Sequence, residues 1–195
     1  MKSALGIVLF SLLFNISGID TSINIGDSVP DFLAKDEEGK DWKLSDHYRH
    51  DYIVLYFYPA AFTGGCTKQA CSYRDQNKDF ENLNALVAGI SGDDYKTLAM
   101  FKKQHGLNFT LLSDPKGQIA EIFGVPFNEG GSTEQEIEGQ SLTLERGVTT
   151  SRWTVVVDGR GKLIYRDNDV NAAEDSETVI KFLTAHKSRK SCVAH

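Results

Sequence analysis

Two cysteines lie five positions apart in the stretch "PAAFTGGCTKQAC", which runs from Pro59 to Cys71 and contains Cys66. A cysteine thiolate can be a nucleophile, a redox partner or a metal ligand. The pair could therefore form a structural disulfide, a metal site or a reactive centre. The elements that position the two thiols decide among these three possibilities.

The elements around Cys66 place it at a junction between a strand and a helix. The run "YIVLYFY" is almost continuously apolar and is ended by Pro59, which predicts a strand buried on both faces. After it, helical spacing relates Cys66, Ala70, Tyr73 and Phe80. At a helix N-terminus a thiol meets unpaired backbone N–H groups and the positive end of the helix dipole, which favour the thiolate. Ligands of α/β proteins also bind at this edge of the sheet, so Cys66 is predicted to be reactive.

The rest of the chain predicts an α/β sandwich with a mixed sheet. The expected elements are a β-hairpin over 29–44, a buried strand in "ALVAGISGD", a helix closed by Gly106, a short strand and short helix over 109–125, a hairpin over 151–167 and a final helix over 176–188. The polar, glycine-containing segment Pro126–Gly147 is expected to be a mobile loop or an excursion from the fold.

Length and charge limit the domain count and the partners. A chain of 195 residues with 41% hydrophobic residues suits one domain, which we place at 19–187 with a flexible tail at 188–195. The formal net charge of −6 argues against nucleic acid or an anionic membrane surface as the main partner.

The N-terminus has the layout of a secretory signal peptide. One lysine precedes an apolar stretch from Ala4 to Phe14, and small and polar residues follow up to Gly18. We expect cleavage of residues 1–18, although an uncleaved anchor is an alternative. The mature protein is then expected outside the cytoplasm, secreted or periplasmic and free of the membrane, where stable disulfides are allowed.

The cysteine stretch also resembles a known active-site pattern. Its residues from Pro59 through Thr63 to Cys66 match the Pro-x-x-x-Thr-x-x-Cys motif of peroxiredoxins, and Cys71 at the fifth position further on is similar to the bacterioferritin-comigratory or Q-type subfamily. The resemblance extends from about Gly26 to the final helix. It implies a thioredoxin-like fold with an N-terminal hairpin and thiol-dependent reduction of hydrogen peroxide or organic hydroperoxides.

The resemblance also implies roles for single residues. Cys66 matches the peroxidatic nucleophile, Thr63 the residue that hydrogen-bonds thiolate and peroxide, and Pro59 the residue that shields the pocket. Arg152 matches an arginine at the start of the strand that faces the pocket, and Cys71 matches the resolving cysteine, which would form a redox disulfide with Cys66. The implied partners are a peroxide and a thioredoxin-like dithiol reductant. We expect no cofactor, no metal and a monomer.

A simple estimate shows why more than an acidic thiol is needed. Lowering the pKa of a cysteine from about 8.5 to about 6 raises its thiolate fraction at pH 7 roughly thirtyfold. The intrinsic nucleophilicity of the thiolate falls about thirteenfold at the same time, so the net gain in rate is only about twofold. Donors for the breaking O–O bond, such as Thr63 and the guanidinium of Arg152, must therefore act on the transition state itself.

The five-residue spacing of Cys66 and Cys71 conflicts with the formation of a disulfide between them. In a continuous helix, residues five apart are separated by about 140° and about 7.5 Å along the axis. A disulfide needs Cα atoms about 4.4–6.8 Å apart. We therefore predict that the first turns of this helix unwind, or begin later, when Cys66 and Cys71 form a disulfide.

Other readings of the cysteines stay open at this point. A purely structural Cys66–Cys71 disulfide would close a loop so short that it adds little stability. Copper-binding thioredoxin-like proteins space their cysteines by four and add a histidine, but we place none of the histidines here at the pocket. An extracytoplasmic thiol-disulfide oxidoreductase would carry Cys-x-x-Cys, which this sequence lacks. Cys192 is read as an idle thiol, an intermolecular linker or a backup resolving cysteine. Gly64 and Gly65 stand where relatives often have Pro-Gly, which loosens the loop.

Overall fold

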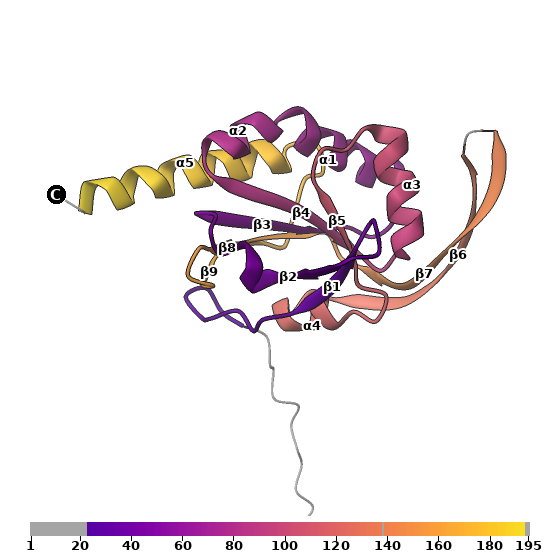
Figure 1. Ribbon diagram of the computed structural model, residues 1–195, viewed down its shortest axis with the longest axis horizontal. Helices are drawn as coiled ribbons and strands as arrows, with labels where there is room; N and C mark the ends of the chain where they lie inside the picture. Colours follow the sequence, from indigo (N-terminus) through magenta and orange to yellow (C-terminus); the bar gives the residue numbers. More distant parts are fainter. Residues whose placement is uncertain (1–22, 138, 194–195) are drawn as a thin grey trace, which may run out of the picture.

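A mixed seven-stranded sheet forms the centre of the protein. The computed structural model describes residues 23–137 and 139–193, so the expected signal peptide lies outside the described residues. The strands follow the order β2-β1-β5-β4-β3-β8-β9 (Figure 1). β3 (Tyr52–Phe57), β4 (Ala85–Ser91) and β5 (Thr110–Ser113) run parallel to one another. All six residues of β3 are buried, as its continuous apolar run predicts.

Two hairpins complete the sheet at its edges. β1 (Leu33–Asp36) and β2 (Asp41–Lys43) form the expected N-terminal hairpin, and β1 pairs antiparallel with β5. β8 (Trp153–Asp158) pairs antiparallel with β3 and turns into β9 (Leu163–Asp167). The predicted α/β sandwich with a mixed sheet is therefore confirmed.

Helices cover both faces of the sheet, as Figure 1 shows. α1 (Gly64–Asp75), α2 (Asn77–Asn82), α3 (Tyr95–His105) and α5 (Asp175–Val193) pack on one face, and α4 (Gln118–Phe123) and the 3-10 helix η1 (Leu44–His47) on the other. Because side chains alternate along a strand, β3 feeds both cores. Tyr52, Val54 and Tyr56 face the first layer, and Ile53, Leu55 and Phe57 face the second.

The helix boundaries differ from the sequence signals in two places. The helical spacing from Cys66 to Phe80 is divided between α1 and α2, with Gln76 between them, and the last helix is longer than expected. Gly106 ends α3 in the left-handed conformation with φ 58°, which glycine adopts without the Cβ strain of other residues. The backbone of α5 stays helical through Val193, so most of the segment expected as a tail at 188–195 continues the helix.

The segment Pro126–Gly147 is an excursion from the body, in agreement with one of its two expected alternatives, but it belongs to a paired β-ribbon and is not a loop. β6 (Phe127–Ile137) and β7 (Gln140–Thr150) pair as a long antiparallel ribbon that projects from the body in Figure 1. β6 is polar and exposed at most positions, so it lacks the apolar alternation that marks a strand, whereas β7 buries Leu144, Val148 and Thr150 on one face. At its base, glycines permit a close backbone approach: a Cβ on Gly130 would lie 1.9 Å from the carbonyl oxygen of Arg146, and one on Gly147 2.0 Å from that of Pro115.

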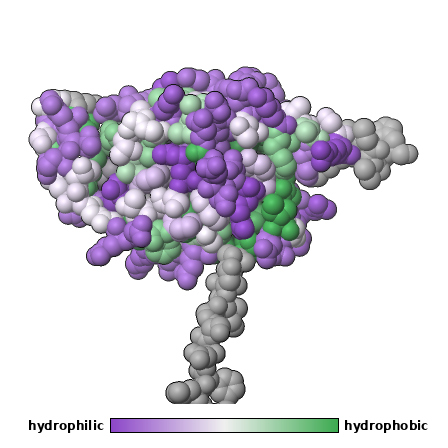
Figure 2. All heavy atoms as spheres, turned by 180° about the vertical axis from the view of Figure 1, so that it is seen from behind, coloured by the Kyte–Doolittle hydropathy of each residue, from purple (hydrophilic) through white to green (hydrophobic). Residues whose placement is uncertain are grey.

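Apolar residues occupy a minor part of the face shown in Figure 2. This face is mostly hydrophilic, with its most apolar area at the lower right and weaker apolar areas elsewhere. The exposed large apolar side chains of the described residues are Ile25, Leu33 and Phe127, which are spread along the sequence. Within the described part of the chain, no helix has the length and apolar character needed to cross a membrane.

Candidate active site

The segment between β3 and α1, residues 58–63, forms what we call the cysteine loop. Its backbone is tied to the neighbouring strands: the amide of Tyr58 donates to the carbonyl of Ile90 at 3.0 Å, and the hydroxyl of Thr150 donates to the carbonyl of Tyr58 at 3.1 Å. The amide of Ala61 donates to a carboxylate oxygen of Asp93 at 2.8 Å. These bonds fix the path of the chain just before Cys66.

Asp93 connects the cysteine loop to the β6–β7 ribbon. The residue is 2% exposed, and the hydroxyl of Ser91 donates to its carboxylate at 2.9 Å. The guanidinium of Arg146, on β7, lies 3.5 Å away from the carboxylate. Burial raises the pKa of Asp93, while its hydrogen bonds and Arg146 act in the opposite direction. The ribbon therefore supplies the cation that partly balances a buried charge beneath the loop.

Phe62 holds an unfavourable backbone conformation within the cysteine loop. Its φ is 63°, in the left-handed region that bulky residues rarely adopt. Its ring packs edge-on against Phe101 of α3, with ring centroids 5.2 Å apart. Such strain persists where the surrounding structure holds it, often beside functional groups.

Cys66 lies in the first turn of α1 and contacts Arg152, as the sequence predicts. The thiol-bearing residue is only 2% exposed, and Nη2 of Arg152 donates to its Sγ at 3.3 Å. The antiparallel pairing of Phe57 with Trp153 explains the contact, because it brings the start of β8 beside the end of β3. A Cβ added to Gly65 would lie 3.4 Å from the same Nη2, so a glycine suits this approach.

Gln69 and Asp175 extend this contact into the core, and sequence reasoning missed both. Nη1 of Arg152 donates to Oε1 of Gln69, and Nε2 of Gln69 donates to Oδ2 of Asp175 at 2.7 Å. Gln69 is fully buried, on the same face of α1 as Cys66 and Tyr73. A polar residue on the buried face of a helix is the signal that could have revealed it.

The other residues predicted for the site lie at its entrance. Thr63 is the exposed N-cap of α1, and its hydroxyl donates to the carbonyl of Ala60 at 2.9 Å. Because a hydroxyl has one proton, Thr63 offers only its lone pairs to other groups in this arrangement. A hydrogen bond from Thr63 to the Cys66 thiolate stays a prediction. Pro59 is partly buried just beyond the end of β3.

Cys71 lies further along the same helix, in a different environment. α1 is continuous from Gly64 to Asp75, and Cys66 and Cys71 are both free. Cys71 is partly buried, close to Arg74, whose pKa is raised by the Asp75 carboxylate and, less strongly, by Cys71. The arrangement agrees with the expectation that the two thiols stay apart while the helix is intact.

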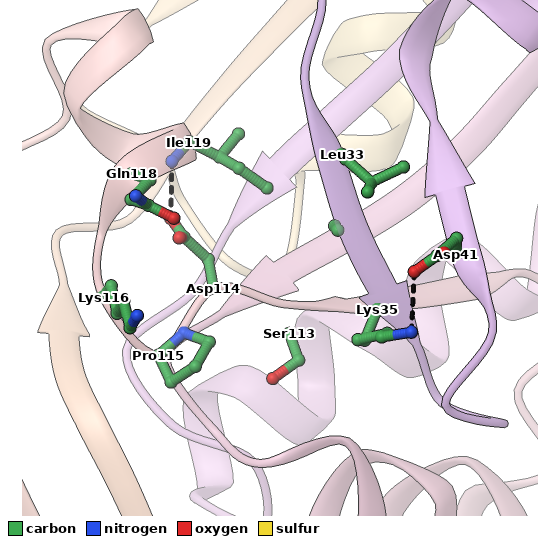
Figure 3. Close-up of a pocket in the computed structure, with 10 residues that line it drawn as sticks. Leu33, Lys35, Asp41, Ser113, Asp114, Pro115, Lys116, Gln118 and Ile119 are labelled. Atoms are coloured by element: carbon green, nitrogen blue, oxygen red, sulfur yellow. Dashed lines mark hydrogen bonds and ion pairs between the residues drawn. The ribbon is translucent and has the colours of Figure 1, made fainter.

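A pocket lies away from this site, between the N-terminal hairpin and α4. It has a volume of about 270 Å³, and its lining includes Leu33, Lys35, Asp41 and Asp114. Figure 3 shows Asp114 accepting a hydrogen bond from the Ile119 amide and Lys35 paired with Asp41. The lining contains neither cysteine of the stretch, so the pocket is no part of the thiol site.

Comparison with known proteins supports the chemical reading of the thiol site. Residues 25–166 match the model of the AhpC/TSA family. The chain is 37% identical over 143 residues to peroxiredoxin Bcp of Bacillus subtilis, which covers 73% of this chain and 83% of that protein. It is also 37% identical over 169 residues to the chloroplastic peroxiredoxin Q of Arabidopsis thaliana, which covers 86% of this chain and 70% of that protein.

Solved structures confirm the thioredoxin-like fold. Peroxidoxin BcpB from Mycobacterium tuberculosis superposes with a TM-score of 0.69 at 31% identity, covering 83% of this chain and 96% of that one. A cysteine-to-serine mutant of peroxiredoxin Q from Xylella fastidiosa gives a TM-score of 0.70 at 25% identity, covering 85% of this chain and 98% of that one. These relatives do not favour the copper-binding and oxidoreductase alternatives. The chain belongs to the AhpC/TSA family, in its bacterioferritin-comigratory or peroxiredoxin Q subfamily, and is a thiol-dependent peroxidase.

Proposed function

We propose that the protein reduces hydrogen peroxide and organic hydroperoxides through a cycle in which Cys66 is oxidised and Cys71 resolves it. The observation that carries the proposal is the contact between Arg152 and the buried Sγ of Cys66 at the start of α1. The guanidinium of Arg152 places a cation and a hydrogen-bond donor beside the sulfur, and the neighbouring residues Thr63 and Gly64 are exposed to solvent.

In the first step the Cys66 thiolate attacks one oxygen of the peroxide. An S–O bond forms and the O–O bond breaks, so the sulfur is oxidised to a sulfenic acid while the departing oxygen leaves with the electron pair and takes a proton as water or alcohol. Arg152 offers several donors in a fixed fork, which suits the two oxygens of the stretched bond. Thr63 contributes its lone pairs to the hydroperoxide proton, and Pro59 restricts water at the loop.

In the second step Cys71 attacks the sulfur of the sulfenic acid. An S–S bond forms, the S–O bond breaks and water leaves, which yields the Cys66–Cys71 disulfide. A thioredoxin-like dithiol then exchanges with this disulfide and is itself oxidised. Because α1 is continuous between the thiols, the step requires local unwinding of residues 67–73.

The direct test is peroxide consumption by the wild type, Cys66→Ser, Cys71→Ser and, as a matched control thiol, Cys192→Ser. We expect Cys66→Ser to be inactive with every reductant. Cys71→Ser should turn over with a monothiol and stall with thioredoxin, and Cys192→Ser should behave as the wild type. Retained activity in Cys66→Ser would refute the proposed nucleophile, and normal thioredoxin-dependent turnover of Cys71→Ser would refute its role.

We extend the proposal to location and assembly. The apolar stretch from Ala4 to Phe14 supports export with removal of residues 1–18. We also propose a monomeric catalytic unit, because Cys66 and Cys71 lie on the same helix. Sequencing the N-terminus of the exported protein tests the first statement, and light scattering of the active enzyme tests the second. A retained Met1 or a stable dimer would contradict the corresponding statement.

A further inference from the structure

Asp175 is a buried carboxylate directly behind the thiol site. It is the first residue of α5 and is 3% exposed. Its Oδ2 accepts three hydrogen bonds, from Nε2 of Gln69 at 2.7 Å and from the hydroxyls of Tyr73 and Thr154 at 2.8 Å each. The carboxylate thus joins α1, β8 and α5 at one point.

The charge of Asp175 is costly where it lies. Its three donors are neutral, and its second oxygen, Oδ1, is buried without a hydrogen-bond partner among the described residues. Burial raises the pKa of Asp175, which shows that the surroundings penalise the ionised form. A protein commonly retains such a cost where function requires it.

The direction of the bond to Gln69 suggests what the charge does. An amide side chain has one acceptor end and one donor end, whereas an ionised carboxylate only accepts. With Nε2 of Gln69 donating to Asp175, Oε1 must face the other way, where Arg152 donates to it. The second terminal nitrogen of the guanidinium, Nη2, then donates to the sulfur of Cys66.

We propose that Asp175 is a positioning residue for peroxide reduction: it fixes the amide orientation of Gln69, which in turn holds Arg152 against Cys66. The inference rests on the proposed function of Cys66 and adds a residue to it. An asparagine at position 175 could donate as well as accept, so the Gln69 amide could turn its NH₂ group toward Arg152. Two donors would then face each other, and the guanidinium would move from the sulfur.

The first experiment compares Asp175→Asn with Asp114→Asn. Asp114 is an apt control because it is also 3% exposed and its pKa is also raised by burial, while it bonds the start of α4 in the pocket of Figure 3. We expect kcat/KM for peroxide to fall roughly ten- to a hundredfold in Asp175→Asn and to stay at the wild-type value in Asp114→Asn. Alkylation of Cys66 by iodoacetamide at pH 7 should slow in Asp175→Asn alone.

Thermal unfolding separates positioning from a merely structural role. Because Asp175→Asn removes a penalised charge, its melting temperature should equal or exceed that of the wild type while activity falls. A loss of stability that parallels the loss of activity would overturn the proposal, as would wild-type kcat/KM in Asp175→Asn. The alkylation rate does not depend on peroxidase activity. Suppose that the wild type consumes no peroxide but that Cys66 is alkylated more slowly in Asp175→Asn than in the wild type. This result would refute the proposed peroxidase function and leave the positioning role of Asp175 intact.

A double-mutant cycle tests the route through Gln69. Gln69→Leu should lower kcat/KM by a similar factor, and adding Asp175→Asn to it should cause no further loss. Independent, multiplying losses would overturn the proposal. If Asp175→Asn does not fold, the test compares Gln69→Leu with Tyr73→Phe, which removes a different bond to Asp175. Equal losses of kcat/KM in these two variants would likewise overturn it.

Discussion

The two cysteines of α1 differ in almost everything except their helix. Cys66 is 2% exposed, contacts Arg152 and lies at the end of a chain of bonds through Gln69 to Asp175. Cys71 is partly buried, nearer the other end of the helix and close to Arg74. Under the proposed function, the Cys66 thiol is held by Arg152 for attack on the peroxide, while Cys71 lies beside a different arginine.

The anchors at the two ends of α1 explain how one helix serves both thiols. At the start, the cysteine loop is tied to Asp93 through the amide of Ala61. Near the end, Nη1 of Arg74 donates to the carbonyl of His105 at 2.6 Å, and Asn108 donates to the carbonyl of Arg74 at 3.2 Å. The residues between these anchors can unwind without detaching the helix, but unwinding would break both hydrogen bonds of Gln69.

The largest effect is expected from removing the cation at Cys66. Arg152→Met should lower kcat/KM for peroxide by roughly 10²–10³-fold, because the transition state loses preorganised donors in a partly buried site. Arg152→Lys keeps the charge without the planar fork and should recover only part of the loss. Stopped-flow peroxide reduction measures both variants. Full activity in Arg152→Met or Arg152→Lys would show that the contact with Arg152 is not what makes Cys66 more reactive than Cys71.

The anchor beneath the cysteine loop should matter more for stability than the anchor near Cys71. Arg146→Met leaves the buried Asp93 without its cation, and we expect a loss on the order of 3 kcal/mol in the free energy of unfolding. Arg74→Met is the matched variant: it removes the pair with the exposed Asp75 and the hydrogen bond to the His105 carbonyl, and should cost about 1–2 kcal/mol. Urea unfolding measures both, and equal losses would contradict the comparison.

The pH dependence of Arg146→Met has a defined sign. The pKa of Asp93 is raised in the folded protein, so the folded state holds this proton more tightly than the unfolded state. Stability from this group therefore falls as the pH rises through the folded value. Loss of Arg146 raises the pKa of Asp93 in the folded protein further. The difference in the free energy of unfolding between Arg146→Met and the wild type should therefore be largest near pH 7. It should shrink as the pH falls toward about 4, and a constant deficit would exclude this explanation.

The sequence predicted the body of the fold better than the ribbon, for a physical reason. β3 and β8 are continuous buried runs and α3 buries a periodic apolar face, and both kinds of pattern are visible in one sequence. β6 is polar along most of its length and is held by pairing with β7, so its residues carry no such signal. Pairing between segments is a property of the folded chain, and a single sequence does not display it.

The candidate site shows the same limit at the level of single residues. Cys66 and Arg152 were found because the sequence around them matches a motif, and the structure brings them together. Gln69 and Asp175 were missed because their roles depend on an encounter between residues 106 positions apart. The helical spacing of Gln69 from Cys66 places Gln69 on the buried face of the helix. The sequence could therefore have identified Gln69, but not Asp175.

Hydrogen exchange can test whether the segment between the anchors unwinds. In the reduced protein, the amides of residues 67–73 should be protected by the continuous helix α1. In the Cys66–Cys71 disulfide form, their protection should fall at least about tenfold, while α3 and β4 stay unchanged. Cys71→Ser treated with peroxide is the control, because it is oxidised at Cys66 but cannot close the disulfide. Equal protection in reduced and oxidised wild type would mean that the thiols meet without unwinding.

The smallest effect is expected at Gly64, the first residue of α1. Proline suits this position, since the first helical amide has no partner within the helix, and an added Cβ would meet no atom within 4 Å. Gly64→Pro should raise the free energy of unfolding by about 0.4–1 kcal/mol by restricting the unfolded chain. The same restriction should slow disulfide formation after oxidation while peroxide reduction by Cys66 keeps its rate, so the substitution affects the resolving thiol alone.

A matching Gly65→Ala, whose Cβ would lie 3.4 Å from Nη2 of Arg152, should instead disturb peroxide reduction. If Gly64→Pro slowed both steps equally, the start of the helix would serve both thiols, and the division of α1 into a fixed end and a yielding segment would fail.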